Sequence, residues 1–354
     1  MTKITKVLKR KHWIIIGATL TLIGLVLSYV FLTKKNDPYS VDIDGVKIPL
    51  KFFDYTDFLG EKDTLKVLNI EKELLQIDTL VHDNLLGSFY RLSYESDTAF
   101  LRGYRNIVKD PAIQEIQKAL NQKCTTLLPL EQNTLYQGFQ RMKVLLPKIK
   151  QPHHIFWINS LFNSSVSIAE NGIAIGVERY LGPSSKVVQR LPSNPFYAWI
   201  KEGMDESYLA RDVISGWLSN HALKETKGSL AEEMIRWGKI LVITEKLLPD
   251  NSTATVLRYQ DKDLNWALAS EASIWKYIIN EQLLYDKGED TQQSLLHEGP
   301  FTGGLPHESP DRLGQFMGYR IVLQYVEQHQ PSLESLLNIP YLTLLQAYEV
   351  PEKK

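Results

Sequence analysis

The sequence predicts a mainly helical α+β protein, in which an N-terminal transmembrane helix precedes one globular domain with a small antiparallel sheet. Three observations predict this class. Trp13–Leu32 carries no charge over 20 residues, several long stretches repeat apolar residues at helical spacing, and only short regions alternate as strands do. No repeat, low-complexity run or inner linker divides the rest of the 354 residues, so we expect a single large domain after the anchor.

The apolar span comes first along the chain. Five basic residues precede it and two follow closely, so residues 1–12 are expected in the cytoplasm. Residues 33–40 then form a linker, and residues 41–354 form a periplasmic body held at the inner membrane. A cleaved signal peptide is the main alternative. Its apolar core is normally about 7–15 residues long and ends at a small-x-small site, which is missing here.

Charge is distributed unevenly about this span. The net charge of -1 combines seven basic and no acidic residues in 1–36 with 33 basic and 41 acidic residues in 37–354, a net of -8. An acidic body argues against a general nucleic-acid binder, whose surface would carry a basic stripe. The single Cys124 excludes an intrachain disulfide and a multi-cysteine zinc site, and it is expected to close a helix as a small buried hydrophobe.

Two hairpins are expected to build the sheet. Residues 41–53 alternate around Asp44-Gly45, a strong signal for a two-residue turn. The apolar run His154–Phe162 predicts a strand that leads into the second hairpin. There, 165–169 and 173–177 flank Asn171-Gly172, which supplies the positive φ angles that the turn needs.

Helices are expected over most of the remaining body. Asp110-Pro111 opens the first as cap and first residue, Ser229 and Glu232 form a capping box, Asp261 caps a further helix, and Ser309 precedes Pro310 in the same way as Asp110. The expected ranges are 112–123, 130–146, 206–222, 229–248, 261–285 and 310–328, with one or two short helices in 332–348. Glycine weakens a helix, so Gly238, Gly314 and Gly318 indicate close helix approach.

No catalytic motif is present. The sequence lacks H-E-x-x-H, G-x-S-x-G, a P-loop and G-x-G-x-x-G, so we predict no catalytic residue, no metal ligand and no cofactor. His153 and His154 are adjacent in a strand and face opposite sides. His297 and His307 flank a loop, where a surface role is more common than metal binding.

One buried carboxylate stands out among the helices. Glu271 shares a helix face with Trp275, and we expect it to pair with an arginine or a backbone donor. Arg236, Lys239 and Arg312 are candidate partners. The candidate interaction or structural polar cluster consists of Asp212, Arg236, Lys239, Glu271, Trp275 and Arg312.

The order of several motifs resembles the GldB-type gliding-motility lipoproteins of Bacteroidetes. The matching segments are Val46–Asp54, Asn171–Pro183, Tyr208–Trp217, Glu233–Lys239 with Leu247–Pro249, Glu271–Trp275, Pro300–Thr302 and Glu308–Gly314. That family resembles predicted zinc peptidases with a zincin-like fold, whose metal-binding helix would correspond to Tyr208–Trp217. This segment has neither His nor Glu, and Trp237-Gly238 replaces a ligand-bearing Glu-Gly pair. The resemblance therefore implies the fold without its metal.

The family's role implies an envelope-anchored component of gliding motility and the associated type IX secretion machinery. A lipoprotein needs a cysteine after its signal segment, and here a membrane-spanning helix takes its place. We therefore expect a non-enzymatic component that binds other envelope proteins. Two alternatives stay open. One is a divergent metal-dependent hydrolase using Glu271, His297 and His307, and the other is a periplasmic receptor with a ligand cleft between the hairpins and a helix pair.

Overall fold

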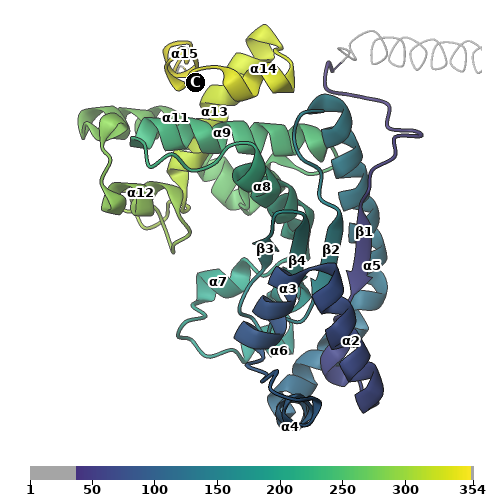
Figure 1. Cartoon of the computed structure of the whole chain (residues 1–354). Helices are drawn as coiled ribbons and strands as arrows, with labels where there is room; N and C mark the ends of the chain where they lie inside the picture. Colours follow the sequence, from purple (N-terminus) through teal and green to yellow (C-terminus); the bar gives the residue numbers. More distant parts are fainter. Residues whose placement is uncertain (1–36, 352–354) are drawn as a thin grey trace, which may run out of the picture. The chain divides into compact units, whose positions relative to one another are not determined.

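The computed structural model describes residues 37–351, and the expected anchor Trp13–Leu32 lies outside that range. The chain divides into two units, residues 1–42 and 43–354, and all strands and helices named below belong to the second. Between residues 37 and 351 no helix is both long and apolar enough to cross a membrane. This unit is mostly helical with one small mixed sheet, which confirms the α+β class (Figure 1).

Four strands form the sheet in the order β1-β2-β4-β3. They are β1 (Lys51–Asp54), β2 (His154–Ile158), β3 (Val166–Ile168) and β4 (Gly172–Gly176). The expected antiparallel pairing of β3 with β4 is confirmed, but its turn differs from the prediction because Gly172 belongs to β4 and neither Asn171 nor Gly172 has a positive φ. The expectation of an antiparallel sheet is wrong because β2 runs parallel to both β1 and β4. Parallel neighbours need long crossovers, which turn signals do not reveal. The continuous apolar run of β2 suits a central strand buried on both faces.

The expected hairpin over residues 41–53 is also wrong. A turn does form at Asp44-Gly45, where Gly45 has a φ of 75°. Its flanks do not pair with each other, because β1 pairs with β2 instead. The side-chain amide of Gln140 donates to the carbonyl oxygen of Val46 at 2.6 Å, which gives this segment a partner outside the hairpin.

The crossover from β1 to β2 covers one face of the sheet with helices. It contains α2 (Thr64–Ile77), α3 (Thr79–His82), a π-helical segment (Asp83–Phe89) and α4 (Asp97–Val108). Phe156, Ile158 and Ala174 of the sheet pack into the apolar core that these helices share. Side chains alternate along a strand, so Ile155 and Trp157, which are also buried, face the opposite side.

Helix α5 (Pro111–Leu145) completes that crossover as a single helix of 35 residues. The sequence suggested two helices, 112–123 and 130–146, separated near Pro129. An internal proline removes one backbone hydrogen bond and costs about 3 kcal/mol. Buried residues on both sides of Pro129, including Leu127, Leu128 and Leu135, keep one face of the helix packed and offset this cost. Cys124 therefore lies inside a helix rather than at its end.

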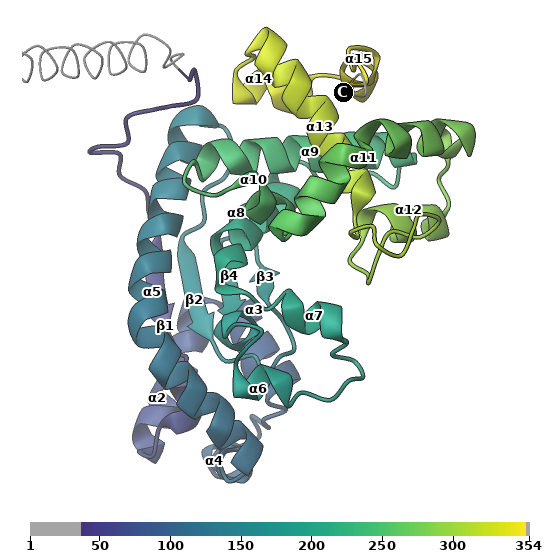
Figure 2. The ribbon, with the colours of Figure 1, turned by 180° about the vertical axis from the view of Figure 1, so that it is seen from behind.

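The C-terminal half is helical and joins the sheet through α8. Figure 2 shows α9, α11 and α13 on one side of α8 and the sheet on the other, in agreement with contacts from α8 to α9 and to β3. The helices are α6 (Lys186–Gln189), α7 (Ala198–Glu202), α8 (Leu209–His221), α9 (Leu230–Leu247), α10 (Thr253–Leu257), α11 (Asp261–Asn280), α12 (Glu289–Leu296), α13 (Leu313–His329), α14 (Leu333–Asn338) and α15 (Tyr341–Gln346).

Helices α9 and α13 touch backbone to backbone at two glycines. A Cβ atom added to Gly318 would lie 1.8 Å from the carbonyl oxygen of Met234. One added to Gly238 would lie 2.1 Å from the carbonyl oxygen of Gly318. A Cβ atom added to Gly314, one turn earlier, would lie 2.8 Å from the carbonyl oxygen of Leu295 in α12. The expectation of close helix approach is confirmed.

The predicted caps are confirmed in part. Ser229 and Glu232 form the expected capping box of α9. Helix α11 is capped by Gln260 rather than Asp261. Helix α13 starts at Leu313 rather than Pro310. The hydroxyl of Thr302 accepts a hydrogen bond from the Leu313 amide and donates one to the Pro310 carbonyl, which keeps residues 310–312 out of the helix.

Candidate functional site

A cleft of about 520 Å³ opens in the C-terminal half of the body. Its walls come from the short helix Val177–Tyr180, from α7, from the segment before α8, from the α10–α11 connection and from residues 298–312 before α13. The volume is within the range of small-molecule and peptide sites. The lining combines three arginines (Arg179, Arg258 and Arg312), five large aromatic residues (Tyr180, Trp199, Tyr208, Tyr259 and Trp266) and five acidic residues (Glu202, Asp263, Glu298, Glu308 and Asp311).

Local backbone geometry directs two of these arginines. Arg258 ends α10 with a φ of 55°, and Arg312 precedes α13 with a φ of 54°. A left-handed backbone conformation costs free energy for a residue with a Cβ atom, and residues held in such a conformation cluster at binding sites. Both residues end or begin a helix at the cleft.

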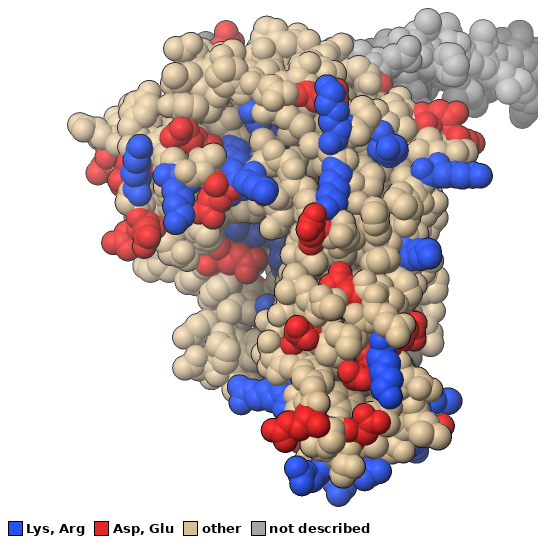
Figure 3. All heavy atoms as spheres, viewed as in Figure 1, with Lys and Arg blue, Asp and Glu red and all other residues tan. Residues whose placement is uncertain are grey.

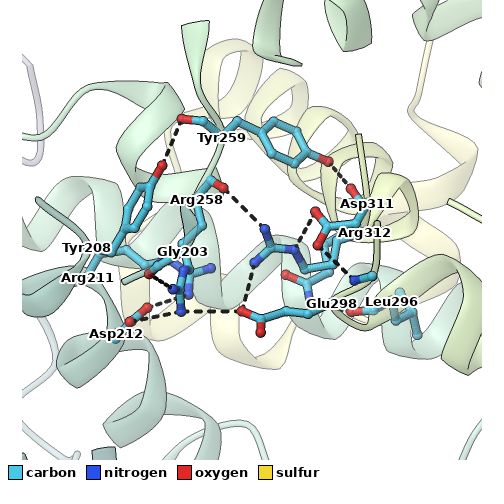
Figure 4. Close-up of polar contacts among 12 residues, drawn as sticks. Gly203, Tyr208, Arg211, Asp212, Arg258, Tyr259, Leu296, Glu298, Asp311 and Arg312 are labelled. Atoms are coloured by element: carbon cyan, nitrogen blue, oxygen red, sulfur yellow. Dashed lines mark hydrogen bonds and ion pairs between the residues drawn. The ribbon is translucent and has the colours of Figure 1, made fainter. Parts of the chain in front are cut away.

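Asp212 is the hub of the inner charge network (Figure 4). Its Oδ1 accepts from Arg211 Nη1 at 3.1 Å. Its Oδ2 accepts from Arg258 Nη1 at 3.0 Å and from the Tyr180 hydroxyl at 2.9 Å. The side chain is only 8% exposed. Because both oxygens are already bound, Asp212 fixes the two guanidiniums instead of acting as a free base.

Glu298 lies at the outer side of the same network. Its Oε1 is 3.3 Å from Arg258 Nη1 and 3.6 Å from Arg312 Nη1, and its side chain is 48% exposed. Arg312 also pairs with Asp311 Oδ1 at 3.0 Å and donates to the carbonyl oxygen of Arg258. Glu298 is therefore held less closely than Asp212.

Burial and neighbouring charges shift the pKa values of these groups. Burial lowers the pKa of Arg211 to about 10. It would also lower the pKa of Arg258 and of Arg312, but nearby carboxylates outweigh it and raise both. Burial would raise the pKa of Glu298, but the surrounding guanidiniums outweigh it and lower that pKa. At neutral pH the guanidiniums of Arg211, Arg258 and Arg312 and the carboxylate of Glu298 are therefore charged.

Arg179 differs from the other arginines of the cleft. It is half-buried, and burial lowers its pKa. Its guanidinium contacts the Phe162 carbonyl oxygen at 3.5 Å and stands 5.8 Å from the Phe196 ring. In residues 37–351 no carboxylate oxygen lies within 4 Å of it, unlike the guanidiniums of Arg211, Arg258 and Arg312. Most of its five N–H donors are therefore free to bind a ligand.

Tyrosines close one wall of the cleft. The Tyr259 hydroxyl donates to the Asp311 carbonyl oxygen at 2.6 Å. The Tyr208 hydroxyl donates to the Tyr259 carbonyl oxygen at 3.4 Å, and the Tyr208 ring lies 5.0 Å from the Arg258 guanidinium carbon. Burial raises the pKa of both hydroxyls. They are therefore neutral donors that support the arginines.

The six residues predicted as a cluster lie in separate places. Asp212 and Arg312 belong to the cleft network and are linked through Arg258. Arg236 pairs with Glu233 on α9. Lys239 donates to the carbonyl oxygens of Leu337 and Ile339, which ties α9 to the end of α14.

Glu271 forms a third group with Trp275. Its carboxylate accepts from Arg320 Nε at 2.9 Å and from the Tyr348 hydroxyl at 2.8 Å. The Tyr348 ring also meets the Trp275 ring edge to face. The partner is therefore Arg320, and the candidates Arg236, Lys239 and Arg312 are wrong. The group joins α11, α13 and the segment after α15.

The histidines of the alternative hydrolase site are not assembled with Glu271. His307 lines the cleft and packs against the Phe301 ring, whereas Glu271 and His297 are outside the lining. Across residues 37–351, no three His, Cys, Asp or Glu side chains gather as a metal-ligand group. Cys124 is buried in α5, and burial raises the pKa of its thiol to about 11.

Comparison with known proteins identifies the family. A sequence model described as gliding motility protein GldB matches residues 36–349. The chain belongs to the GldB family. The match spans the described body almost completely, confirms the resemblance, and associates the chain with gliding motility. No curated protein and no solved structure matches.

Three of the segments that carry the GldB resemblance, Asn171–Pro183, Tyr208–Trp217 and Glu308–Gly314, contain some of the charged residues in and behind the cleft. Arg179 lies in the first, Arg211 and Asp212 in the second, and Asp311 and Arg312 in the third. Sequence reasoning missed Arg179, Arg211, Arg258 and Glu298 as site residues. A sequence signal for Arg179 and Arg211 was available, because each lies beside an acidic residue, Glu178 or Asp212, in a GldB segment that is mostly apolar. Arg258 and Glu298 lie outside these segments.

Proposed function

We propose that this GldB-family chain is a membrane-anchored, non-enzymatic component of the gliding machinery that binds other envelope proteins. The family match over residues 36–349 carries the proposal. In this proposal Trp13–Leu32 anchors the chain in the inner membrane, the basic N-terminus is cytoplasmic and the body is periplasmic. Type IX secretion, which the family resemblance implies, would use the same anchored body.

The chemistry of the cleft supports recognition as its role. Asp212 has both oxygens bound by buried donors, so its carboxylate shapes a cationic wall. Aromatic rings and guanidiniums are the side chains that contribute most to protein recognition sites. We therefore combine two of the hypotheses, the component that binds envelope proteins and the periplasmic receptor with a ligand cleft. In the combined proposal, the chain recognises a partner through this cleft.

A zincin-like origin fits the same geometry. Helix α8 follows a small sheet whose edge strand β3 is antiparallel, and it packs against β3. The resemblance assigns the metal-binding helix of a zinc peptidase to Tyr208–Trp217, which contains Asp212. In this chain the positive groups beside Asp212 are the guanidiniums of Arg211 and Arg258. We infer that guanidinium–carboxylate pairing organises this cleft where a peptidase relative would use a metal.

The surface supports a protein partner rather than a nucleic acid. On the face shown in Figure 3, Lys and Arg side chains alternate with Asp and Glu side chains and form no continuous basic area. Residues 37–354 carry a net charge of -8, from 33 basic and 41 acidic residues. Nucleic-acid binding normally uses a contiguous basic surface.

Deletion and complementation test this function. Cells without the gene should lose gliding, and the full-length gene should restore it. In spheroplasts, added protease should digest the body without permeabilisation of the inner membrane, because the body is expected in the periplasm. Normal gliding of the deletion strain would contradict the motility role, and a protected body would contradict the orientation.

A further inference from the structure

The cleft contains a carboxylate of the chain's own that resembles a bound ligand. Glu298 stands beside Arg258 and Arg312, and the guanidiniums of Arg211 and Arg179 also act on its charge. Its two ion pairs, at 3.3 and 3.6 Å, are longer than those of Asp212, at 3.0 and 3.1 Å. Nearly half of the Glu298 side chain is exposed, so this carboxylate can leave without opening the core.

A further guanidinium of the cleft forms no close ion pair within residues 37–351, and the charges of Glu178 and Glu298 act on it only from a greater distance. Arg179 lines the same cleft, and between residues 37 and 351 it has no carboxylate oxygen within 4 Å. The nearest acidic neighbour in sequence, Glu178, is fully buried and accepts hydrogen bonds from the Ser160 and Phe162 amides at 3.1 and 2.8 Å. Its carboxylate is therefore held on the core side, away from the cleft.

The charge balance of the inner cleft favours one further anion. Four guanidiniums, from Arg179, Arg211, Arg258 and Arg312, lie in or behind the cleft, and three carboxylates, from Asp212, Glu298 and Asp311, pair with the last three of them. Departure of Glu298 would leave two positive charges unbalanced in a partly desolvated site. A guanidinium there forms strong, paired hydrogen bonds to a carboxylate.

The rim restricts the ligand further. Glu202, Asp263 and Glu308 also line the cleft together with Lys262, and three of these four residues are exposed, so this more exposed part of the lining, here called the rim, is net negative. A polyanion would meet repulsion at these side chains. A ligand with one carboxylate and an otherwise neutral or cationic body fits both regions, and the rings of Trp199 and Trp266 can pack against its apolar part.

We propose that the cleft binds the carboxylate of a ligand, above all the C-terminal carboxylate of a partner protein, and that this group displaces Glu298 and binds to Arg179 as well. The proposal rests on the proposed function and names the chemistry of its recognition site. Glu298 then acts as an internal competitor that keeps the site closed to weak ligands. The same chemistry admits an acidic side chain or a small free dicarboxylate.

Binding to the full-length protein tests the proposal without any variant. The probes are N-acetylated tetra-alanine with a free carboxylate, the same peptide as its C-terminal amide, the amide with one internal glutamate, and succinate. Because Trp199 and Trp266 line the cleft, tryptophan fluorescence and calorimetry can both report binding. The free acid should bind at least about tenfold more tightly than its amide, since the amide loses charged hydrogen bonds.

The other two probes distinguish the sources of the carboxylate. Preference for the free acid assigns a chain terminus, preference for the internal glutamate assigns an acidic side chain, and binding of succinate alone assigns a small acid. Each of these outcomes supports a carboxylate site. Equal binding of acid and amide, or no binding of any probe at millimolar concentration, would overturn it.

Two variants and a matched control test the named residues. Glu298→Gln removes the competing charge and should tighten binding of the preferred probe by about three- to tenfold. Arg179→Met should weaken it by about tenfold or more. Arg190→Met is the control, because Arg190 is exposed, pairs with Glu115 and lies outside the cleft lining. Weaker binding by Glu298→Gln would overturn the competitor role, with melting curves confirming that each variant is folded.

Failure here and failure of the proposed function are separable. If no probe binds while the deletion strain still fails to glide, the motility role stands and the carboxylate site is wrong. If the carboxylate binds while the deletion strain glides normally, the site stands and the motility role is wrong.

Discussion

Gly318→Ala perturbs the closest backbone contact between α9 and α13. The new Cβ atom would lie 1.8 Å from the Met234 carbonyl oxygen and 2.6 Å from its carbon. Backbone atoms cannot rotate away as a side chain can, so the two helices must separate by about 1 Å or more. A gap of that size removes a large share of the dispersion energy between the facing side chains.

The magnitude follows from two opposing terms. Overpacking of a filled interior costs about 1–3 kcal/mol and occasionally more, and contact with backbone puts this case at the upper end. Alanine returns about 1 kcal/mol of helix propensity relative to glycine. We therefore expect the free energy of unfolding to fall by about 2 kcal/mol, which corresponds to a decrease in Tm of about 4 °C.

Gly216→Ala is the matched control, in α8. A Cβ atom there would meet only the Ile168 side chain, at 3.6 Å, which is ordinary contact. This variant should keep the propensity gain and be as stable as the native chain or more stable. The assay is thermal and urea unfolding of the full-length protein, followed by fluorescence. If Gly318→Ala is as stable as Gly216→Ala, the close approach of α9 and α13 is wrong.

Three other predictions concern buried groups. Burial raises the pKa of Glu131 to about 7 from an ordinary 4.5, so the folded state binds more protons between these values and loses stability as pH rises. The free energy of unfolding of Glu131→Gln, measured by urea titration, should equal that of the native chain near pH 4 and exceed it by about 3 kcal/mol at pH 8. The same pH dependence in both proteins would contradict this. Glu178→Ala leaves the Ser160 and Phe162 amides without an acceptor and should lower the free energy of unfolding by about 3 kcal/mol in urea titrations. Glu178→Gln keeps an acceptor oxygen and should lower it clearly less. Equal losses in the two variants would refute the acceptor role. Cys124, whose thiol pKa burial raises to about 11, should react with a thiol reagent at pH 8 only after unfolding, and rapid labelling of the folded protein would contradict its burial.

Local signals in the sequence predicted much of the fold. The β3–β4 hairpin, the capping box of α9 and the two short helices before the C-terminus all depend on residues close together in the chain. The parallel pairing of β1 with β2 depends on a crossover of about 100 residues, and no turn residue encodes it. The intact helix α5 also depends on distant packing, which offsets the cost of Pro129.

The candidate site could be predicted only in part for a similar reason. Asp212 and Arg312 were singled out, and both belong to the cleft network. Arg258 was missed because its role depends on a left-handed backbone that arginine rarely adopts. Glu298 was missed because its partners are 40 residues earlier and 14 residues later, and only the folded loop brings them together.

Gliding of cells that carry single cleft variants tests the central claim most directly. Strains with Arg179→Met or the control Arg190→Met replace the native gene, and single-cell tracking is combined with measurement of protein abundance. Arg179→Met cells should stop gliding although the variant protein is as abundant as the native one, whereas Arg190→Met cells should glide normally. Normal gliding of the Arg179→Met strain would contradict a role for the cleft in partner recognition.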